Sequence, residues 1–257
     1  MNGFSSPKEI SEATLGAAET KAALPVYKKL ILGFLAGIYI GFGAVGFLTL
    51  TTVLSGDLAG FGKFFGACVF PVGLMLVVIC GAELFTGNVL MTLGVYAKRI
   101  DLKGLFGNWV FVYIGNAIGS IFLAFIVAQS GLFAAGGMNA TIVNLGVAKT
   151  SAGFLPLFCK GILCNILVDL AVWYATGAKD IAGKALACFF PIMLFVLSGY
   201  EHCVANMFYL PLAQFSGAGI SGAAVWFGNI LPVTLGNIVG GMLVTCSYYF
   251  AYVRQSK

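Results

Sequence analysis

The chain has 257 residues, of which 60% are hydrophobic and only 9% are charged, and its formal net charge at pH 7 is +5. An ordinary soluble domain has about 25% charged residues, so this composition argues against a soluble fold. The length accommodates six membrane-spanning helices, because each needs about 20 apolar residues to cross a hydrocarbon core about 30 Å thick.

The first 25 residues contain charged side chains throughout and lack the apolar core of a cleavable signal peptide. Within them, Ser6 and Glu9 have the spacing of a capping box, and Pro7 suits the first turn of a helix. We therefore expect residues 1–25 to form a cytoplasmic amphipathic segment at the membrane surface.

Six apolar segments follow in chain order, at approximately residues 28–54, 63–97, 106–129, 154–176, 184–210 and 226–253. Each is long enough to cross the membrane as a helix. The connections on one side hold 11 of the 14 basic residues, namely Lys8, Lys21, Lys28, Lys29, Lys98, Arg99, Lys103, Lys179, Lys184, Arg254 and Lys257. Because Lys and Arg are retained in the cytoplasm, both termini of this multi-pass chain are predicted to be cytoplasmic.

Three groups of residues recur in the two halves of the chain, in the same order and at offsets of 120, 118 and 121 positions. Phe70-Pro71 recurs as Phe190-Pro191. Gly81, Glu83 and Asn88 recur as Gly199, Glu201 and Asn206. Asn108, Gly115, Asn116 and Gly119 recur as Asn229, Gly236, Asn237 and Gly240. Each half has three spans, so the second half enters the membrane from the opposite side. The sequence therefore predicts one all-α domain over residues 1–257, with an inverted 3+3 repeat of about residues 28–129 and 154–253.

The second and fifth segments are interrupted by polar residues, at 81–88 and 199–206. A straight helix through either segment would overshoot the bilayer, so we expect a helix, a short polar loop and a second half-helix. The N-terminal ends of the half-helices would then point inward and favour a small anion. This arrangement is typical of a pathway for small solutes, whereas close helix packing through the glycines alone would leave the two glutamates unexplained.

Polar residues at the two breaks are candidates for the pathway. His202 follows Glu201 directly, and a histidine there could exchange protons near neutral pH. Glu83 and Glu201 occupy equivalent positions, which favours a structural role in capping the half-helix ends through backbone N–H groups over a role as paired catalytic carboxylates. Asn88 and Asn206 are likewise expected to be structural at the breaks.

Further polar residues lie outside the breaks. Asn165 and Asp169 are four residues apart and share one helix face, which we expect to point into the protein. Lys149, in the long connection before the fourth span, either raises the local anion concentration or is a solvated loop charge. Lys160 could place its ammonium at the membrane interface.

Cysteine and histidine counts bear on metal and redox chemistry. The seven cysteines show no C-x-x-C spacing and the chain has one histidine, which argues against a disulfide framework and a metal centre. The sequence contains no phosphate-binding glycine loop and no haem motif. We therefore expect no catalytic residues, cofactor, metal or nucleic-acid partner.

Three motifs together resemble the formate/nitrite transporter family: Glu-Leu-Phe-Thr-Gly-Asn at 83–88, Gly-Tyr-Glu-His-Cys-Val-Ala-Asn-Met-Phe at 199–208, and Leu-Gly-Asn at 235–237. The resemblance extends from the N-terminal segment to the last span and is greatest for the clostridial hydrosulfide channel branch. It implies an aquaporin-like protomer, a homopentamer with one pore per protomer, and a location among the lipids of a bacterial cytoplasmic membrane. The implied substrates are small monovalent anions, with hydrosulfide favoured and formate, nitrite and chloride as alternatives.

The resemblance also assigns roles to individual residues. Thr86 and His202 would be the polar pair at the pore centre, with Asn165 holding the histidine, and Lys149 would attract anions. The apolar constrictions would be formed by Leu84 and Phe195 and by Phe70, Leu74 and Val168. Either a protonated His202 steadies the anion, or it gives up a proton so that a neutral acid crosses, and a proton-coupled formate or nitrite transporter is the alternative to a passive channel.

Overall fold

The computed structural model describes residues 3–134 and 138–254. Six of its helical stretches are long and apolar enough to cross a membrane: Val26–Val53, Gly56–Gly81, Leu102–Gln129, Phe154–Gly177, Ile181–Ser198 and Ala224–Val253. These stretches correspond in order to the six predicted spans. The all-helical fold class with six spans is therefore confirmed.

Helix α1 (Pro7–Ala23) begins with the predicted capping box. The Ser6 side chain accepts the Glu9 N–H, and the Glu9 carboxylate accepts the Ser6 N–H. The buried side of α1 contains Ile10, Leu15 and Ala18 and packs across the ends of other helices, which include α5 (Thr92–Tyr96) and α8 (Phe154–Gly177). Thus α1 is part of the folded bundle.

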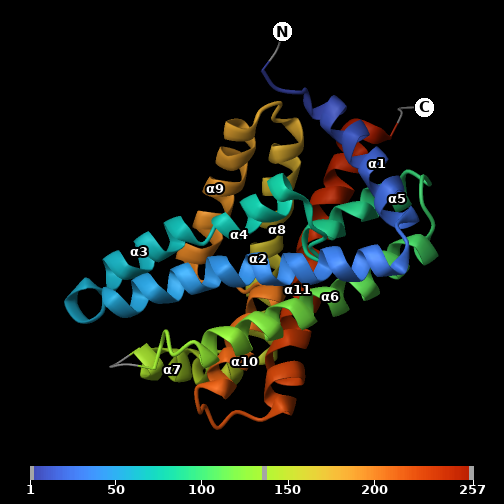
Figure 1. Cartoon of the computed structure of the whole chain (residues 1–257). Coiled ribbons are helices and arrows are strands. Elements are labelled where there is room, and N and C mark those ends of the chain that lie inside the picture. The colour runs from blue at the N-terminus through green and yellow to red at the C-terminus, as the bar shows by residue number, and fades with distance from the viewer. Residues whose placement is uncertain (1–2, 135–137, 255–257) are drawn as a thin grey trace.

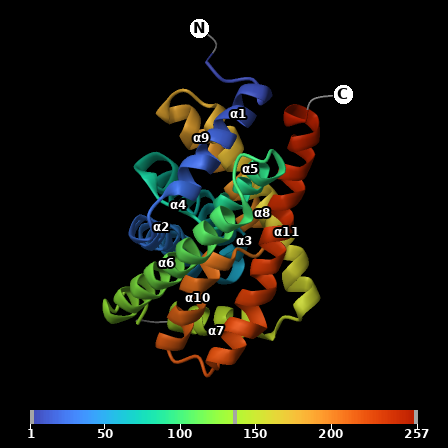
Figure 2. The ribbon, with the colours of Figure 1, turned by 90° about the vertical axis from the view of Figure 1, so that its right-hand side faces the viewer.

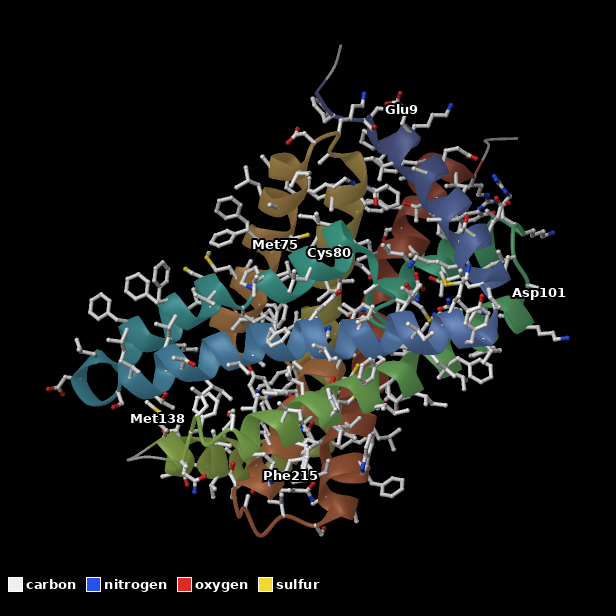
Figure 3. The ribbon with its side chains drawn as sticks, viewed as in Figure 1. Glu9, Met75, Cys80, Asp101, Met138 and Phe215 are labelled. Atoms are coloured by element: carbon white, nitrogen blue, oxygen red, sulfur yellow. The ribbon has the colours of Figure 1, made fainter. Side chains whose placement is uncertain are left out.

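The second and fifth spans are interrupted, as predicted. The second consists of α3 (Ala59–Val69), α4 (Val72–Met75) and a π-helical turn at Leu76–Gly81, followed after the break by a 3-10 turn at Gly87–Met91 that leads into α5. Met75 and Cys80, labelled in Figure 3, lie on the stretch before this break. The fifth consists of α9 (Ile181–Ser198) and α10 (Cys203–Phe215).

A glycine with positive φ turns the chain at each break. Gly81 has φ of +87° and Gly199 has φ of +73°, a region that side chains with a Cβ rarely adopt. The recurrence of these glycines in the sequence therefore has a backbone cause, since each one ends a helix at the point where the polar loop begins.

Two pairs of helices cross at equivalent places in the two halves. In the first half α2 (Val26–Val53) packs on α6 (Leu102–Gln129), and in the second half α8 packs on α11 (Leu231–Tyr248). Helix α11 follows a π-helical turn at Ala224–Ile230 and continues into another at Tyr249–Val253. A Cβ at Gly119 would overlap the carbonyl oxygen of Phe34, and one at Gly236 would overlap that of Phe158. The repeated glycines permit these crossings because they allow backbone-to-backbone contact.

An additional helix, α7 (Met138–Ser151), occupies the connection that the sequence analysis treated as a loop. Its buried residues are Ile142 and Gly146, and Gly146 packs against Ala213 of α10. In Figures 1 and 2, α1 and α7 lie at opposite ends of the molecule, whereas the N-terminal and C-terminal ends lie together near α1. Helix α7 is therefore the counterpart of α1 in the inverted repeat.

Candidate functional site

A lysine and a glutamate form an ion pair at the first break. The Lys21 Nζ lies 2.5 Å from the Glu83 Oε1 and 2.9 Å from the Asn88 Oδ1. The Asn88 amide donates to the Glu83 Oε2 at 2.7 Å, and the Asn108 amide donates to the Lys21 carbonyl oxygen at 3.1 Å. This cluster ties the end of α1 to the break and gives the buried Glu83 carboxylate a cationic partner.

The second break contains the same arrangement. The Lys149 Nζ lies 2.7 Å from the Glu201 Oε2, which also accepts the Asn206 amide at 2.7 Å. The Asn229 amide donates to the Lys149 carbonyl oxygen at 2.8 Å. Lys149 on α7 is therefore the counterpart of Lys21 on α1.

From the sequence alone, Lys21 is predicted only as a cytoplasmic charge. A signal for its role is present in the sequence, because Lys21 and Lys149 both stand five positions before the helix that follows them, at Val26 and Phe154. This shared spacing can be recognised only once residues 138–151 are known to form a helix, as residues 7–23 do.

The hydrogen bonds found on both glutamate carboxylates come from lysine and asparagine side chains. At the start of α10 it is His202 that caps the helix, because its ring Nδ1 accepts the Ala205 N–H at 3.1 Å. The prediction that Glu201 caps this half-helix through backbone N–H groups is therefore wrong. A carboxylate so close to a lysine is better stabilised by the ammonium than by peptide dipoles.

Two asparagines bind backbone groups of the breaks and of the helices beside them. The Asn116 amide donates to the carbonyl oxygens of Gly33 and Glu83, and its Oδ1 accepts the Phe85 N–H at 2.9 Å. The Asn237 side chain makes the equivalent three bonds, to Gly161, Glu201 and Cys203. The sequence shows these asparagines as part of the repeat but predicts no role for them. Inside a bilayer such bonds are needed because water cannot replace them.

Thr86 and His202 meet between the two breaks. The Thr86 Oγ1 lies 2.8 Å from the His202 Nε2, and both residues are buried. Because Nδ1 accepts the Ala205 N–H, the neutral ring carries its proton on Nε2 and donates to Thr86. The two breaks therefore contribute one polar pair.

Asn165 has a different partner from the one that the family resemblance implies. Its amide donates to the carbonyl oxygens of Thr86 at 3.2 Å and Asn237 at 2.9 Å. It therefore joins the backbone of the first break to that of α11, and its contact with the central pair is through the Thr86 carbonyl oxygen. Asp169 is fully buried on the same face, as expected, and its carboxylate oxygens have no hydrogen-bond partner among the described residues.

The apolar residues predicted to form two constrictions gather around one narrow cavity next to His202. Its volume is about 10 Å³ and it is lined by Phe70, Leu74, Leu84, Val168 and Phe195, with Ile40 and Ile192 in addition. A cavity of this size is at the lower limit for one water molecule. The Phe195 ring stacks on the His202 ring with centroids 5.9 Å apart and an interplanar angle of 17°. The five predicted residues therefore border one closed stretch.

A wider cavity of about 280 Å³ also borders His202 and adjoins the narrow cavity there. We call it the Lys149 vestibule. Its lining includes three lysines, Lys63, Lys149 and Lys160, and one glutamate, Glu201. Phe70, Phe195 and His202 border both this vestibule and the narrow cavity, so the two follow one another along a single path.

Among residues 3–134 and 138–254, no group of three or more His, Cys, Asp or Glu side chains is arranged to hold a metal ion. Along this path the described residues therefore provide lysine ammonium groups in the Lys149 vestibule and apolar side chains around the narrow cavity. The His202 imidazole, hydrogen-bonded to the Thr86 hydroxyl, lies where the two cavities meet.

Comparison with known proteins gives consistent matches over the whole chain. A model of the family described as "Formate/nitrite transporter" matches residues 8–251. The "Probable formate transporter" of Methanothermobacter thermautotrophicus is 39% identical over 277 residues, which cover 99% of each chain. The "Formate channel FocA" of Escherichia coli strain K12 is 32% identical over 271 residues, which cover 97% of this chain and 95% of that protein.

Two solved structures also match most of this chain. A chain described as "Pentameric formate channel with formate bound" is 35% identical, with a TM-score of 0.78 over 89% of this chain and 98% of that chain. A chain described as "FNT family ion channel" is 32% identical, with a TM-score of 0.87 over 95% of this chain and 98% of that chain.

Proposed function

The chain belongs to the formate/nitrite transporter family, and from this premise we propose that it is a channel for small monovalent anions, with formate as its first substrate. The pore passes from the Lys149 vestibule to Thr86 and His202. The observation that carries this proposal is the order of groups along one path: ammonium groups line the wide mouth, and His202, which is hydrogen-bonded to the Thr86 hydroxyl, borders both this mouth and the apolar cavity that follows.

The geometry of His202 favours a passive route. Its Nδ1 already accepts the Ala205 N–H, so a second ring proton would place two donors against each other. A neutral His202 instead offers its Nε2 proton, together with the Thr86 hydroxyl, as hydrogen-bond donors to an anion that displaces their mutual bond. Such donors offset part of the cost of desolvating the anion between apolar side chains.

The choice of formate follows from the relatives, several of which are described as formate channels. Hydrosulfide, which the motif resemblance to the clostridial branch favours, is the second candidate, and nitrite and chloride are the comparison anions. All four are small monovalent anions, and their discrimination depends on the narrow cavity.

The proposal extends to assembly and orientation. We place five copies in a bacterial cytoplasmic membrane, each with its own pore, because one of the matched structures is described as pentameric. The basic residues put both chain ends on the cytoplasmic side, and the Lys149 vestibule then opens outward. Apolar residues spaced four apart and exposed on α6 form a face for lipid or a neighbouring copy: Phe106, Val110, Ile114, Ile118 and Phe122.

Flux into proteoliposomes of the purified protein tests the proposal. Formate, hydrosulfide, nitrite and chloride are compared on one preparation, with and without an imposed pH gradient. We expect formate to move only down its own electrochemical gradient. Uphill accumulation of an anion driven by protons would instead establish the proton-coupled transporter, and no anion flux at all would overturn the channel.

The variant His202→Asn tests the centre of the pore. Loss of a hydrogen bond to a charged group is worth about 1.5–3 kcal/mol, so formate flux is expected to fall by about ten-fold or more. Unchanged flux with an unchanged pH dependence, in a variant that elutes as a single species of the wild-type size, would remove His202 from the pathway.

A further inference from the structure

The charge of Lys149 is already compensated in the folded protein. Its ammonium lies 2.7 Å from the Glu201 carboxylate, and the two side chains are only 14% and 8% exposed. An anion in the vestibule therefore faces a neutral pair at this position. The field of Lys149 alone does not make this mouth positive.

Two other lysines in the same vestibule are uncompensated. Lys63 and Lys160 line the cavity, both are exposed, and neither forms an ion pair with a carboxylate in the described part of the chain. Three ammonium groups therefore face one carboxylate around the cavity of about 280 Å³, which leaves a net charge of +2.

The fold uses the backbone of Lys160 and has no evident need for its side chain. The Lys160 carbonyl oxygen accepts the Glu201 N–H at 3.3 Å. At the equivalent place in the first repeat, the Leu32 carbonyl oxygen accepts the Glu83 N–H at 3.2 Å. A leucine thus performs the same structural task in the other half, so this hydrogen bond does not require an ammonium at position 160.

We propose that Lys160, with Lys63, forms an anion-docking subsite in the Lys149 vestibule. These two side chains supply the uncompensated charge that concentrates small monovalent anions such as formate before the narrow cavity, whereas Lys149 holds Glu201 in place. The inference rests on the proposed anion channel and names the residues that carry its electrostatic attraction. Attraction of this kind is screened by salt, over about 30 Å at 0.01 M and about 3 Å at 1 M ionic strength.

The test is the initial rate of formate uptake into proteoliposomes at low formate concentration, at 0.01 M and 1 M ionic strength. Lys160→Leu copies the residue of the first repeat and should lower the rate about two- to five-fold at low salt. The double variant with Lys63→Gln should lower it further. At 1 M ionic strength the uptake rates of both variants should approach that of the wild type. The rate of Lys160→Arg should equal the wild-type rate at both ionic strengths.

Lys103→Leu is the matched control, because it removes one exposed charge at the start of α6, outside the vestibule lining. It should leave the rate unchanged at both salt concentrations. Wild-type rates for Lys160→Leu at 0.01 M, or a decrease of equal size at both salt concentrations, would overturn the docking subsite while the channel stands. A wild-type protein that carries none of the four anions would overturn both proposals.

Discussion

At the scale of single residues, asparagine amides are what make the interrupted helices possible. Asn116 and Asn237 each bind one carbonyl oxygen and one N–H at a break, together with one carbonyl oxygen of a neighbouring helix, and Asn165 joins the first break to α11 through the carbonyl groups of Thr86 and Asn237. A short polar side chain on a neighbouring helix thus substitutes for the helical bonds that the backbone has lost.

Replacement of Asn237 by alanine should destabilise the protein. The carbonyl oxygen of Glu201 and the N–H of Cys203, both at the second break, would lose their partner, which costs about 2–4 kcal/mol when buried groups stay unpaired. Thermal unfolding in detergent should therefore have a lower midpoint. Asn144→Ala, on the exposed side of α7, is the control and should unfold like the wild type. Equal midpoints for both variants would show that water or a rearranged backbone satisfies these groups.

At the scale of elements, α1 and α7 close opposite ends of the repeat, and each is tied to a break through a lysine, Lys21 or Lys149. Helix α7 packs into the bundle through Ile142 and Gly146. Helix α1 is held, besides its buried side, by Arg99 from the turn before α6, which pairs with Glu12 at 3.0 Å and through two nitrogens with Glu19. These pairs are exposed, so they orient α1 more than they stabilise the fold.

Attachment of α1 should weaken in acid. The hydrogen bond from Arg99 lowers the pKa of Glu19 below its ordinary value of 4.5. A carboxyl with a lowered pKa in the folded state contributes at pH values above its ordinary pKa, and the contribution disappears as the pH falls through the folded-state pKa. Hydrogen exchange of residues 7–23, corrected for intrinsic rates, should be constant between pH 6 and 8 and faster near pH 3.

Arg99→Gln is the control for this prediction. Exchange in its α1 should already be faster at neutral pH, with little further change in acid. If the wild-type helix exchanged equally slowly at both pH values, the Arg99 pairs would not contribute to the attachment of α1.

At the scale of the whole molecule, the two halves of one chain enclose the candidate path. Thr86 comes from the first repeat and His202 from the second, and the residues around the narrow cavity come from both. A single protomer therefore contains every described group that the proposed path requires, and assembly would add copies of a complete pore.

Mixed assemblies should show this independence. When wild-type protein and His202→Asn are co-expressed, formate flux per assembly should fall in proportion to the fraction of variant, so that equal amounts leave about half. A single pore shared by five copies would instead leave about one part in thirty. Native mass spectrometry measures the composition of each assembly and also tests for five copies, and a stoichiometry other than five would contradict the proposed homopentamer.

Much of the architecture follows from the sequence because its causes are local or repeated. Apolar length determines the six spans, and glycines that recur at Gly81 and Gly199 with polar neighbours determine the interruptions. The odd number of spans in each half makes the repeat inverted. None of these inferences needs the distance between two residues that are far apart in the chain.

The tertiary structure decided which polar groups meet. Lys149 pairs with a glutamate 52 positions away and Lys21 with one 62 positions away, while Asn165 reaches the Thr86 backbone. Such pairs depend on how helices cross and on which face each presents, and hydrophobic periodicity does not encode these quantities. For the same reason, only the tertiary structure shows that Glu201 neutralises Lys149. It also shows that Lys63 and Lys160 line the Lys149 vestibule without a carboxylate partner among the described residues.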